Sequence, residues 1–284
     1  MAGSTWRCRD ATLELGGRTL VMGVVNVTPD SFSDGGLFVD AEEAVAHAAR
    51  LVDEGAHLVD VGGESTRPGA DPVPLGEELA RILPVIQGLR SARPDAVISI
   101  DTRHASVAAA ALEAGARVVN DVTAGADPEL FDVVRDAGAG LVLMHMKGDP
   151  KTMQDDPRYE DVVGEVHGFL RERLEAALFA GISEPQLAID PGIGFGKNTE
   201  HNLALLRALS RMADLDAALV VGASRKRFIG TLTGTDDPGD RLEGSIAAAV
   251  WAAVNGADVV RVHDVGATVR ALAVTDAIAR GHPA

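Results

Sequence analysis

Eight short apolar runs in this sequence end at, or close to, polar side chains that could bind a ligand or transfer a proton. A single polar residue after an apolar run is most often a helix cap or a turn former. Eight in register are harder to assign to caps alone, so we expect most of them to face one pocket. They include two carboxylates, two amides, a lysine, an arginine and two histidines: Asp101, Asp190, Asn26, Asn120, Lys226, Arg261, His145 and His263.

The two carboxylates allow two kinds of chemistry. Asp101 and Asp190 could form a general acid/base pair. They could instead be recognition carboxylates, each accepting two N–H bonds from a guanidine-like edge of a ligand. The sequence leaves both open. His145, between two methionines, is equally compatible with packing and with function.

Two glycine-containing stretches lie near these residues. The first, DPGIGFGK at 190–197, is not a phosphate loop, because Pro191 and Asn198 stand where that motif needs glycine and a hydroxyl. Its glycines let the backbone approach a ligand, and Phe195 offers a ring for stacking. The second, GASRKR at 222–227, is a basic turn near an expected helix start, which can itself bind anions. We expect it to face an acidic or carbonyl-rich ligand.

The metal-ligating residue types favour magnesium over zinc. The chain has one cysteine, Cys8, which excludes internal disulfides and makes a zinc–thiolate cluster implausible. No histidine or carboxylate spacing resembles a zinc site. Mg²⁺ commonly uses one or two protein oxygens together with water and substrate phosphate. Asn26 could supply one such oxygen.

The charge balance limits the partners of the chain. Its 284 residues carry 42 Asp and Glu against 26 Lys and Arg, a formal charge of -16. So acidic a surface repels nucleic acid and anionic membranes, but not a small anion held by local cations. The N-terminal residues lack the apolar core of a signal peptide, and no apolar run approaches the roughly 20 residues that span a bilayer. A cytoplasmic protein is expected.

A repeated pattern indicates the elements that position these side chains. Four segments share a glycine, an alanine and an aliphatic run, at 54–60, 114–120, 137–143 and 255–261. Helical patterns cover 41–54, 105–114, 128–137, 242–255 and, as a longer stretch, 162–180. The glycine is typical of a helix C-cap, and the aliphatic run of a parallel strand covered on both faces.

Counting the apolar runs predicts the fold. They cover 21–25, 58–61, 97–100, 118–119, 141–144, 187–189, 219–221 and 259–260. Eight strand–helix units predict an α/β fold, a (β/α)8 TIM barrel that forms a single domain over 1–284, with the site at the strand C-termini. A short hairpin is expected at about 12–20, with a Gly16-Gly17 turn. A doubly wound sheet is the alternative, but its glycine fingerprint is missing after the first run.

Seven motifs in this order resemble dihydropteroate synthases. They are NVTPDSFSDGG at 26–36, GGESTRPGA at 62–70, MHMKG at 144–148, TMQ at 152–154, DPGIGFGK at 190–197, GASRK at 222–226 and RVHDV at 261–265. The resemblance covers the chain from about residue 12 to its end. It implies a TIM barrel, in agreement with the repeat count.

The family resemblance implies a transferase of folate synthesis. Such an enzyme joins 6-hydroxymethyl-7,8-dihydropterin diphosphate to p-aminobenzoate and releases diphosphate and 7,8-dihydropteroate. By matching motif, the pterin ring would contact Asp101, Asn120, Asp190 and Lys226. The diphosphate would lie among Asn26, Thr66, Arg261 and His263, with Asn26 on Mg²⁺. Phe195, Arg67 and Pro68 would border the p-aminobenzoate site. Many relatives carry a small hydroxyl residue where this chain has Arg227, so the contacts of that second substrate stay open.

The resemblance also implies a mechanism and an assembly. Diphosphate would leave first, drawn by Mg²⁺, Arg261 and His263, and the carboxylates would favour the remaining methylene cation. The loops 27–36 and 63–74 would close over the site. Asp30 or Asp34 could pair with Arg67 or serve only in turns. A homodimer is expected, with contacts through the helices after the sixth to eighth strands.

Three other functions compete with this interpretation. A pterin-dependent methyltransferase would not need the basic diphosphate set or the 65–68 loop, and this chain has both. A silent paralogue that binds pterins without turnover would be expected to lose that loop or Lys226. An aldolase would use Lys226 for a Schiff base, which the neighbouring arginines and the pterin carboxylates disfavour.

Overall fold

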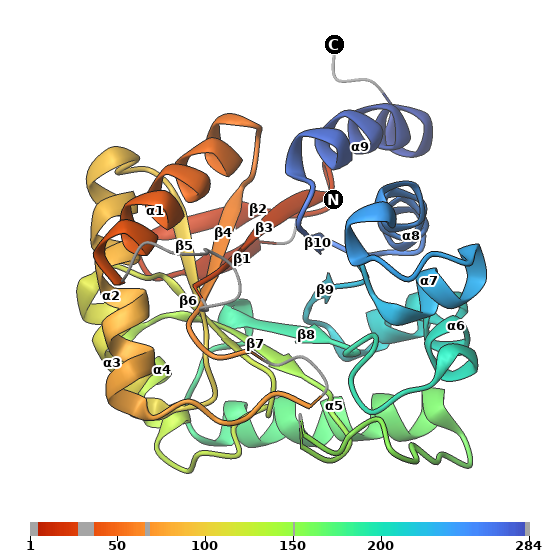
Figure 1. Cartoon of the computed structure of the whole chain (residues 1–284). Helices are drawn as coiled ribbons and strands as arrows, with labels where there is room; N and C mark the ends of the chain where they lie inside the picture. Colours follow the sequence, from red (N-terminus) through yellow and green to blue (C-terminus); the bar gives the residue numbers. More distant parts are fainter. Residues whose placement is uncertain (1–4, 28–36, 66–68, 150, 282–284) are drawn as a thin grey trace.

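The computed structural model describes residues 5–27, 37–65, 69–149 and 151–281. Eight parallel strands close a barrel in the order β10-β3-β4-β5-β6-β7-β8-β9, and helices surround it (Figure 1). The strands are β3 (Leu20–Asn26), β4 (Leu58–Gly62), β5 (Val97–Asp101), β6 (Val118–Asp121), β7 (Gly140–Met144), β8 (Leu187–Asp190), β9 (Ala218–Val221) and β10 (Val259–Val262). The predicted TIM barrel is confirmed, with all eight strands at the predicted runs.

The helices follow the strands in the expected alternation. They are α1 (Leu37–Asp53), α2 (Leu75–Ala92), α3 (Ala105–Ala114), α4 (Leu130–Ala137), α5 (Val162–Phe179), α6 (Thr199–Arg207), α7 (Arg227–Thr233), α8 (Leu242–Val254) and α9 (Val265–Arg280). Short 3-10 segments cover Glu184–Gln186, Leu209–Leu215 and Pro238–Asp240. The repeat glycines Gly115 and Gly138 end α3 and α4 in the left-handed conformation, as the pattern predicted. No described helix is long and apolar enough to cross a membrane.

The alternation of side chains along each strand divides the core in two. Val59 and Val61 of β4 point outward and pack in the large cluster against the helices. Leu58 points inward and joins a second cluster that fills the barrel floor with Met22, Val118 and others. Because the side-chain period of a strand is two, Asp60 and its counterparts two residues after each floor residue also point inward. This parity places polar side chains in the barrel directly above an apolar floor.

The N-terminal hairpin is real, but its predicted position was wrong. Strand β1 (Thr5–Cys8) pairs antiparallel with β2 (Ala11–Glu14), and the turn lies at Arg9 and Asp10 instead of Gly16-Gly17. Of the predicted second arm, residues 18–20, only Leu20 belongs to a strand, β3, whose two edges pair with β10 and β4 and cannot also serve a hairpin. The hairpin closes the barrel floor, where Trp6 is fully buried and donates from Nε1 to the Gln186 carbonyl at 3.0 Å.

Candidate functional site

A cavity of about 960 Å³ opens at the C-terminal ends of the barrel strands. Six of the predicted site residues line it: Asn26, Asp101, Phe195, Lys226, Arg261 and His263. Asn120 and Asp190 lie deeper, each about one-twentieth exposed. The strand ends therefore bring the predicted residues to one mouth, as the barrel topology requires.

A buried charge network connects four of these strands. Arg261 donates from Nε to Asp60 Oδ2 at 2.7 Å and from Nη2 to Asp101 Oδ2 at 2.8 Å. Asn120 donates from Nδ2 to the same Asp60 oxygen at 2.9 Å. Burial raises the pKa of Asp101 to about 7; the Asp60, Glu78 and Asp121 charges also raise it, while Arg261 opposes them. This arrangement leaves the carboxamide oxygen of Asn120 without a hydrogen-bond partner among the described residues.

Asp190 is the second buried carboxylate at the cavity floor. It accepts a hydrogen bond from the Gly192 amide at 2.7 Å, which orients it at the end of β8. Burial raises its pKa, against the Gly192 hydrogen bond and the charges of Lys226, Arg261 and Lys197. On the neighbouring strand end, a side chain at Gly222 would lie 3.7 Å from both Asp190 Oδ2 and Arg261 Cβ. Glycine there keeps the space between the two charged groups open.

Lys226 and Phe195 form one wall of the cavity. The Lys226 ammonium lies 3.8 Å from the centroid of the Phe195 ring, within cation–π distance. Gly194 has φ +86° and passes so close to Lys226 that a Cβ would lie 2.9 Å from its Cδ. Gly194 thus lets the backbone pack against Lys226, while Gly192 and Gly196 pack against the backbone of His145 and Lys147. The lysine lies between this loop and the barrel mouth.

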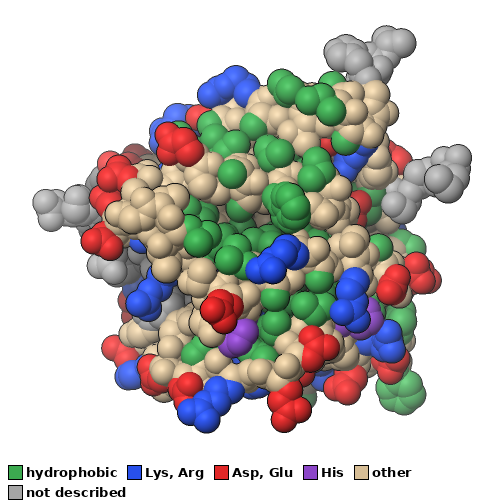
Figure 2. Space-filling view, turned by 90° about the vertical axis from the view of Figure 1, so that its right-hand side faces the viewer, with side chains coloured by type: hydrophobic (Ala, Val, Ile, Leu, Met, Phe, Trp, Pro, Cys, Tyr) green, Lys and Arg blue, Asp and Glu red, His purple; other side chains and the backbone are tan. Residues whose placement is uncertain are grey.

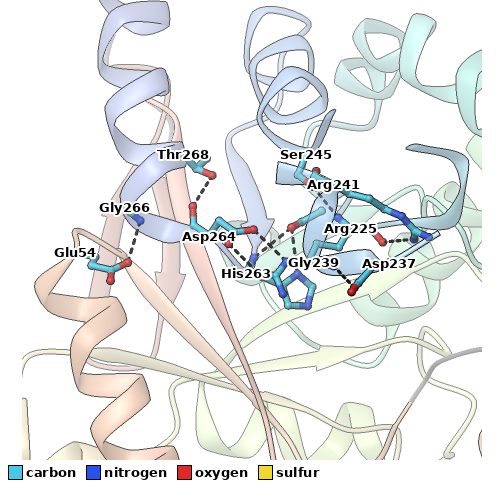
Figure 3. A network of polar contacts seen from close by, with 11 residues as sticks. Glu54, Arg225, Asp237, Gly239, Arg241, Ser245, His263, Asp264, Gly266 and Thr268 are labelled. Carbon is cyan, nitrogen blue, oxygen red and sulfur yellow. Dashed lines mark hydrogen bonds and ion pairs between the residues drawn. The ribbon is translucent and has the colours of Figure 1, made fainter. Parts of the chain in front are cut away.

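The adjacent basic turn is held by a polar network (Figure 3), of which Arg225, Arg241 and His263 line the cavity. Arg225 has φ +59° and pairs with Asp264 at 2.7 Å. Its amide donates to Ser245 Oγ at 2.9 Å, and Arg241 donates to its carbonyl at 3.0 Å. These contacts fix the conformation of Arg225, which lines the cavity together with Ser224 and Lys226. Arg227 also lines the cavity, with an exposed side chain that has no partner among the described residues.

His263 and His145 have different surroundings. His263 lines the cavity with Nδ1 3.1 Å from Ser224 Oγ. Burial, then the charges of Arg261, Arg225 and Lys226, lowers its pKa to about 3. It is therefore a neutral imidazole that can offer a hydrogen bond but no charge. His145 packs edge-on against Phe169 at 4.9 Å, which favours its packing interpretation.

Sequence reasoning missed Lys197 and Asp60. Lys197 is buried, and its ammonium contacts His145 Nδ1 at 2.8 Å and the carbonyls of Gly192 and Phe195 at 2.9 Å. Burial lowers its pKa to about 7. It fixes the loop that carries Phe195. The available signal was a lysine directly after G-F-G; for Asp60 it was a carboxylate inside an aliphatic run.

Asn26 is suited to a cation that is held mainly by substrate. It is half-buried at the end of β3, lines the cavity, and its carboxamide has no partner in the described part of the chain. No cluster of three or more His, Cys, Asp or Glu side chains suited to a metal occurs among the described residues. One neutral oxygen fits Mg²⁺ bound through substrate phosphate and water better than a closed protein site.

Several predicted residues fall outside the described residues. These are Thr66, Arg67 and Pro68 of the second loop, and Asp30 and Asp34 of the first. Their predicted roles at the substrates and in loop pairing stay predictions. Ser65, which precedes them, lines the cavity.

Comparison with known proteins identifies the family. A family model described as pterin binding enzyme matches residues 22–263. A dihydropteroate synthase of Synechocystis sp. is 46% identical over 266 residues, 93% of this chain and 92% of that protein. The Escherichia coli dihydropteroate synthase is 45% identical over 257 residues, 90% of each chain.

Solved structures agree with this result. A Xanthomonas albilineans dihydropteroate synthase with 4-aminobenzoic acid superposes with a TM-score of 0.92 at 50% identity, covering 99% of this chain and 100% of the other. A second structure from that organism, in complex with 7,8-dihydropteroate, gives 0.88 at 48% identity, over 98% and 100% of the two chains. The chain described here belongs to the pterin-binding enzymes and, among them, to the dihydropteroate synthases.

Proposed function

We propose that this chain condenses 6-hydroxymethyl-7,8-dihydropterin diphosphate with p-aminobenzoate to 7,8-dihydropteroate and diphosphate. The observation that carries this proposal is the ordering of charge along the cavity. Buried carboxylates lie at its floor, and cationic side chains lie around its mouth. Relatives at about 45% identity have this activity in their name, and two similar structures contain p-aminobenzoate and 7,8-dihydropteroate.

The floor of the cavity suits an aminopyrimidinone ring. Asp190 and the Asn120 oxygen can accept from the 2-amino group and ring N–H, and the Lys226 ammonium can donate to a ring acceptor. Asp101 is already ion-paired with Arg261. Of the two interpretations of the carboxylates, recognition is therefore better supported than an acid/base pair. Phe195, beside Lys226, would border the aromatic amine together with Thr66, Arg67 and Pro68.

The diphosphate would lie against Arg261 and His263, with Asn26 as the protein ligand of Mg²⁺. When bound, Mg²⁺ would neutralise phosphate charge and so lower the barrier to diphosphate departure. Arg261 binds the leaving oxygens by charge, and neutral His263 offers a hydrogen bond. Preorganised donors aimed at developing charge are usually the largest catalytic contribution.

The reaction then proceeds in two steps. The C–O bond breaks, the diphosphate keeps the electron pair, and a methylene cation conjugated with the pterin remains. The carboxylates of Asp101 and Asp190 favour this cation by charge. The amine nitrogen of p-aminobenzoate then bonds to the methylene carbon and releases a proton. The loops 27–36 and 63–74 would close beforehand to exclude water.

We also propose that the protein works as a cytoplasmic homodimer. Exposed apolar side chains gather on the helices that follow the last three barrel strands: Leu232, Trp251, Val254, Val274 and Ile278. Figure 2 views this side of the molecule and shows hydrophobic side chains spread across it. Large apolar side chains exposed on neighbouring helices support a protein interface on this side.

The decisive experiment measures diphosphate release from the pterin substrate, with and without p-aminobenzoate and with and without Mg²⁺. We expect release that depends on both. Absence of amine-dependent release would contradict the proposed function. The order of binding is tested separately by titrating p-aminobenzoate calorimetrically: its affinity should fall when diphosphate or Mg²⁺ is omitted, and equal affinity in their absence would refute the ordered scheme.

A further inference from the structure

Asp60 is a charged residue inside the barrel that the proposed reaction does not yet use. It lies in the middle of β4, has no exposed surface, and points inward between Val59 and Val61. Burying an ionised carboxylate is costly unless nearby groups bind it. Its partners therefore indicate what it does.

Both partners of Asp60 belong to the candidate site. Its Oδ2 accepts from Arg261 Nε at 2.7 Å and from Asn120 Nδ2 at 2.9 Å. Its Oδ1 is buried and has no partner within the described residues. Asn120 thus fixes the rotation of the carboxylate, and the carboxylate holds one edge of the guanidinium. Asp101 holds another edge of the guanidinium by accepting a hydrogen bond from Arg261 Nη2 at 2.8 Å.

Two carboxylates on one guanidinium fix its plane and its direction. A guanidinium has five N–H donors in a rigid fork. The two bonds to the carboxylates use the N–H of Nε and one N–H of Nη2. The remaining donors stay available beside the cavity that Arg261 lines. An unrestrained arginine side chain would lose conformational entropy on binding an anion, whereas a fixed one has lost it on folding.

We propose that Asp60 is the positioning residue of Arg261, holding its guanidinium so that the free N–H groups point at the anionic leaving group. This inference rests on the proposed function. Asp60 has no exposed surface, so it acts through Arg261 and does not touch substrate. The carboxylate also supplies the negative charge that keeps a partly buried arginine favourable inside the barrel.

The variant Asp60→Asn tests this role. Its carboxamide has nearly the same shape and keeps an oxygen for Asn120, but it lacks the charge that holds the guanidinium. We expect kcat/KM for the pterin diphosphate to fall by about tenfold or more, mainly through kcat, because small misplacements of a catalytic group are costly. The Kd of a pterin without diphosphate should change by less than about twofold, since the ring contacts remain. A general structural defect would weaken both.

Asp258→Asn is the matched control. Asp258 is also a barrel carboxylate, and it accepts the Leu219 amide at 2.9 Å, but it precedes β10 at the opposite end of the barrel. This control should retain wild-type kinetics. If it lost activity as Asp60→Asn does, the loss would reflect barrel stability and the inference would be refuted.

A second comparison uses the background of Arg261→Met. There Asp60→Asn should change kcat/KM by less than about twofold, because the group it positions is gone. The double variant removes both members of the ion pair, so its kinetics can still be measured even if Asp60→Asn alone folds poorly. Equal losses in both backgrounds, or wild-type kinetics for folded Asp60→Asn, would overturn the inference. If the wild-type protein releases no diphosphate, it is the proposed function that fails.

Discussion

Opposing interactions set the pKa of Asp101 near neutrality, so its protonation is sensitive to pH there. Burial raises its pKa from 3.8 to about 7, the charges of Asp60, Glu78 and Asp121 act in the same direction, and Arg261 opposes them. The folded protein therefore holds this proton more tightly than the unfolded chain. The stabilisation of the folded state by this bound proton is complete below about pH 4 and is lost as the pH rises through about 7.

The same titration predicts pH-dependent ligand binding. An ionised Asp101 favours positive charge on the pterin, so affinity for a pterin without diphosphate should strengthen between about pH 6 and pH 8. Calorimetric titration across this range measures it. Asp101→Asn should bind more weakly and show a flatter pH profile. A wild-type affinity that does not change over this range would contradict the assignment.

Lys197 controls the shape of the loop that carries Phe195. Its ammonium contacts the carbonyls of Gly192 and Phe195 and the ring of His145, and all of these are buried with it. Lys197→Met should lower the free energy of unfolding by about 2 to 4 kcal/mol, because buried acceptors lose their donor. It should also raise KM for p-aminobenzoate. Urea denaturation and steady-state kinetics measure the two effects.

Lys151→Met is the control for that substitution, since the Lys151 side chain is 63% exposed and pairs with the exposed Asp71. A surface change of this kind should alter stability by about 0.5 kcal/mol or less. If Lys197→Met were equally mild, the lysine would not be what holds the loop.

At the scale of elements, the strands were predictable because each is buried on both faces and marked by what flanks it. The run at 141–144 is apolar throughout, the run at 58–61 is aliphatic apart from Asp60, and repeat glycines follow the helices before them. The hairpin was misplaced because only Trp6 and Cys8 mark its buried face. The Gly16-Gly17 pair was a stronger local turn signal, although it connects β2 to the barrel.

The hairpin should matter for stability more than for chemistry. Trp6 is fully buried in the barrel floor, at the end opposite the cavity. Trp6→Ala should cost about 3 to 5 kcal/mol of unfolding free energy through the cavity it leaves. Trp6→Phe, which keeps most of the volume but loses the bond to Gln186, should cost less. Activity per folded molecule should stay near wild type in both, which thermal denaturation and kinetics of the folded fraction can measure.

The candidate site was predictable only in part, because its geometry depends on distant pairings. Asp101 and Asp190 stood out as carboxylates that end aliphatic runs. The link from Arg261 to Asp60 spans 201 residues, and that from Arg261 to Asp101 spans 160. Spacing along the chain does not encode such contacts; they follow from barrel closure, which places β10 beside β3, one strand away from β4. Asp60 lies two residues after the floor residue Leu58, and this spacing could have indicated that its side chain points inward.

At the scale of the whole molecule, the net charge of -16 opposes two anionic substrates. The cations beside the cavity have distinct surroundings: Arg225 is paired with Asp264, and Arg261 with Asp60 and Asp101. Arg227 lies on the cavity wall without a partner among the described residues. Among the described residues that line the cavity, six are lysine or arginine and two are aspartate, so the lining is basic although the molecule as a whole is acidic. The attraction of substrate should weaken as salt rises.

The outer face of α8 and α9 predicts the assembly. Val274 and Ile278 lie one turn apart on α9 and are 62% and 82% exposed. Replacing both with glutamate places charge in the proposed interface, where it would be desolvated, so a dimer should become a monomer. Light scattering coupled to size-exclusion chromatography measures the mass. Phe179→Glu is the control, because Phe179 is 96% exposed at the end of α5, away from those helices. A wild-type monomer, or a dimer that survives the α9 substitutions, would refute this interface.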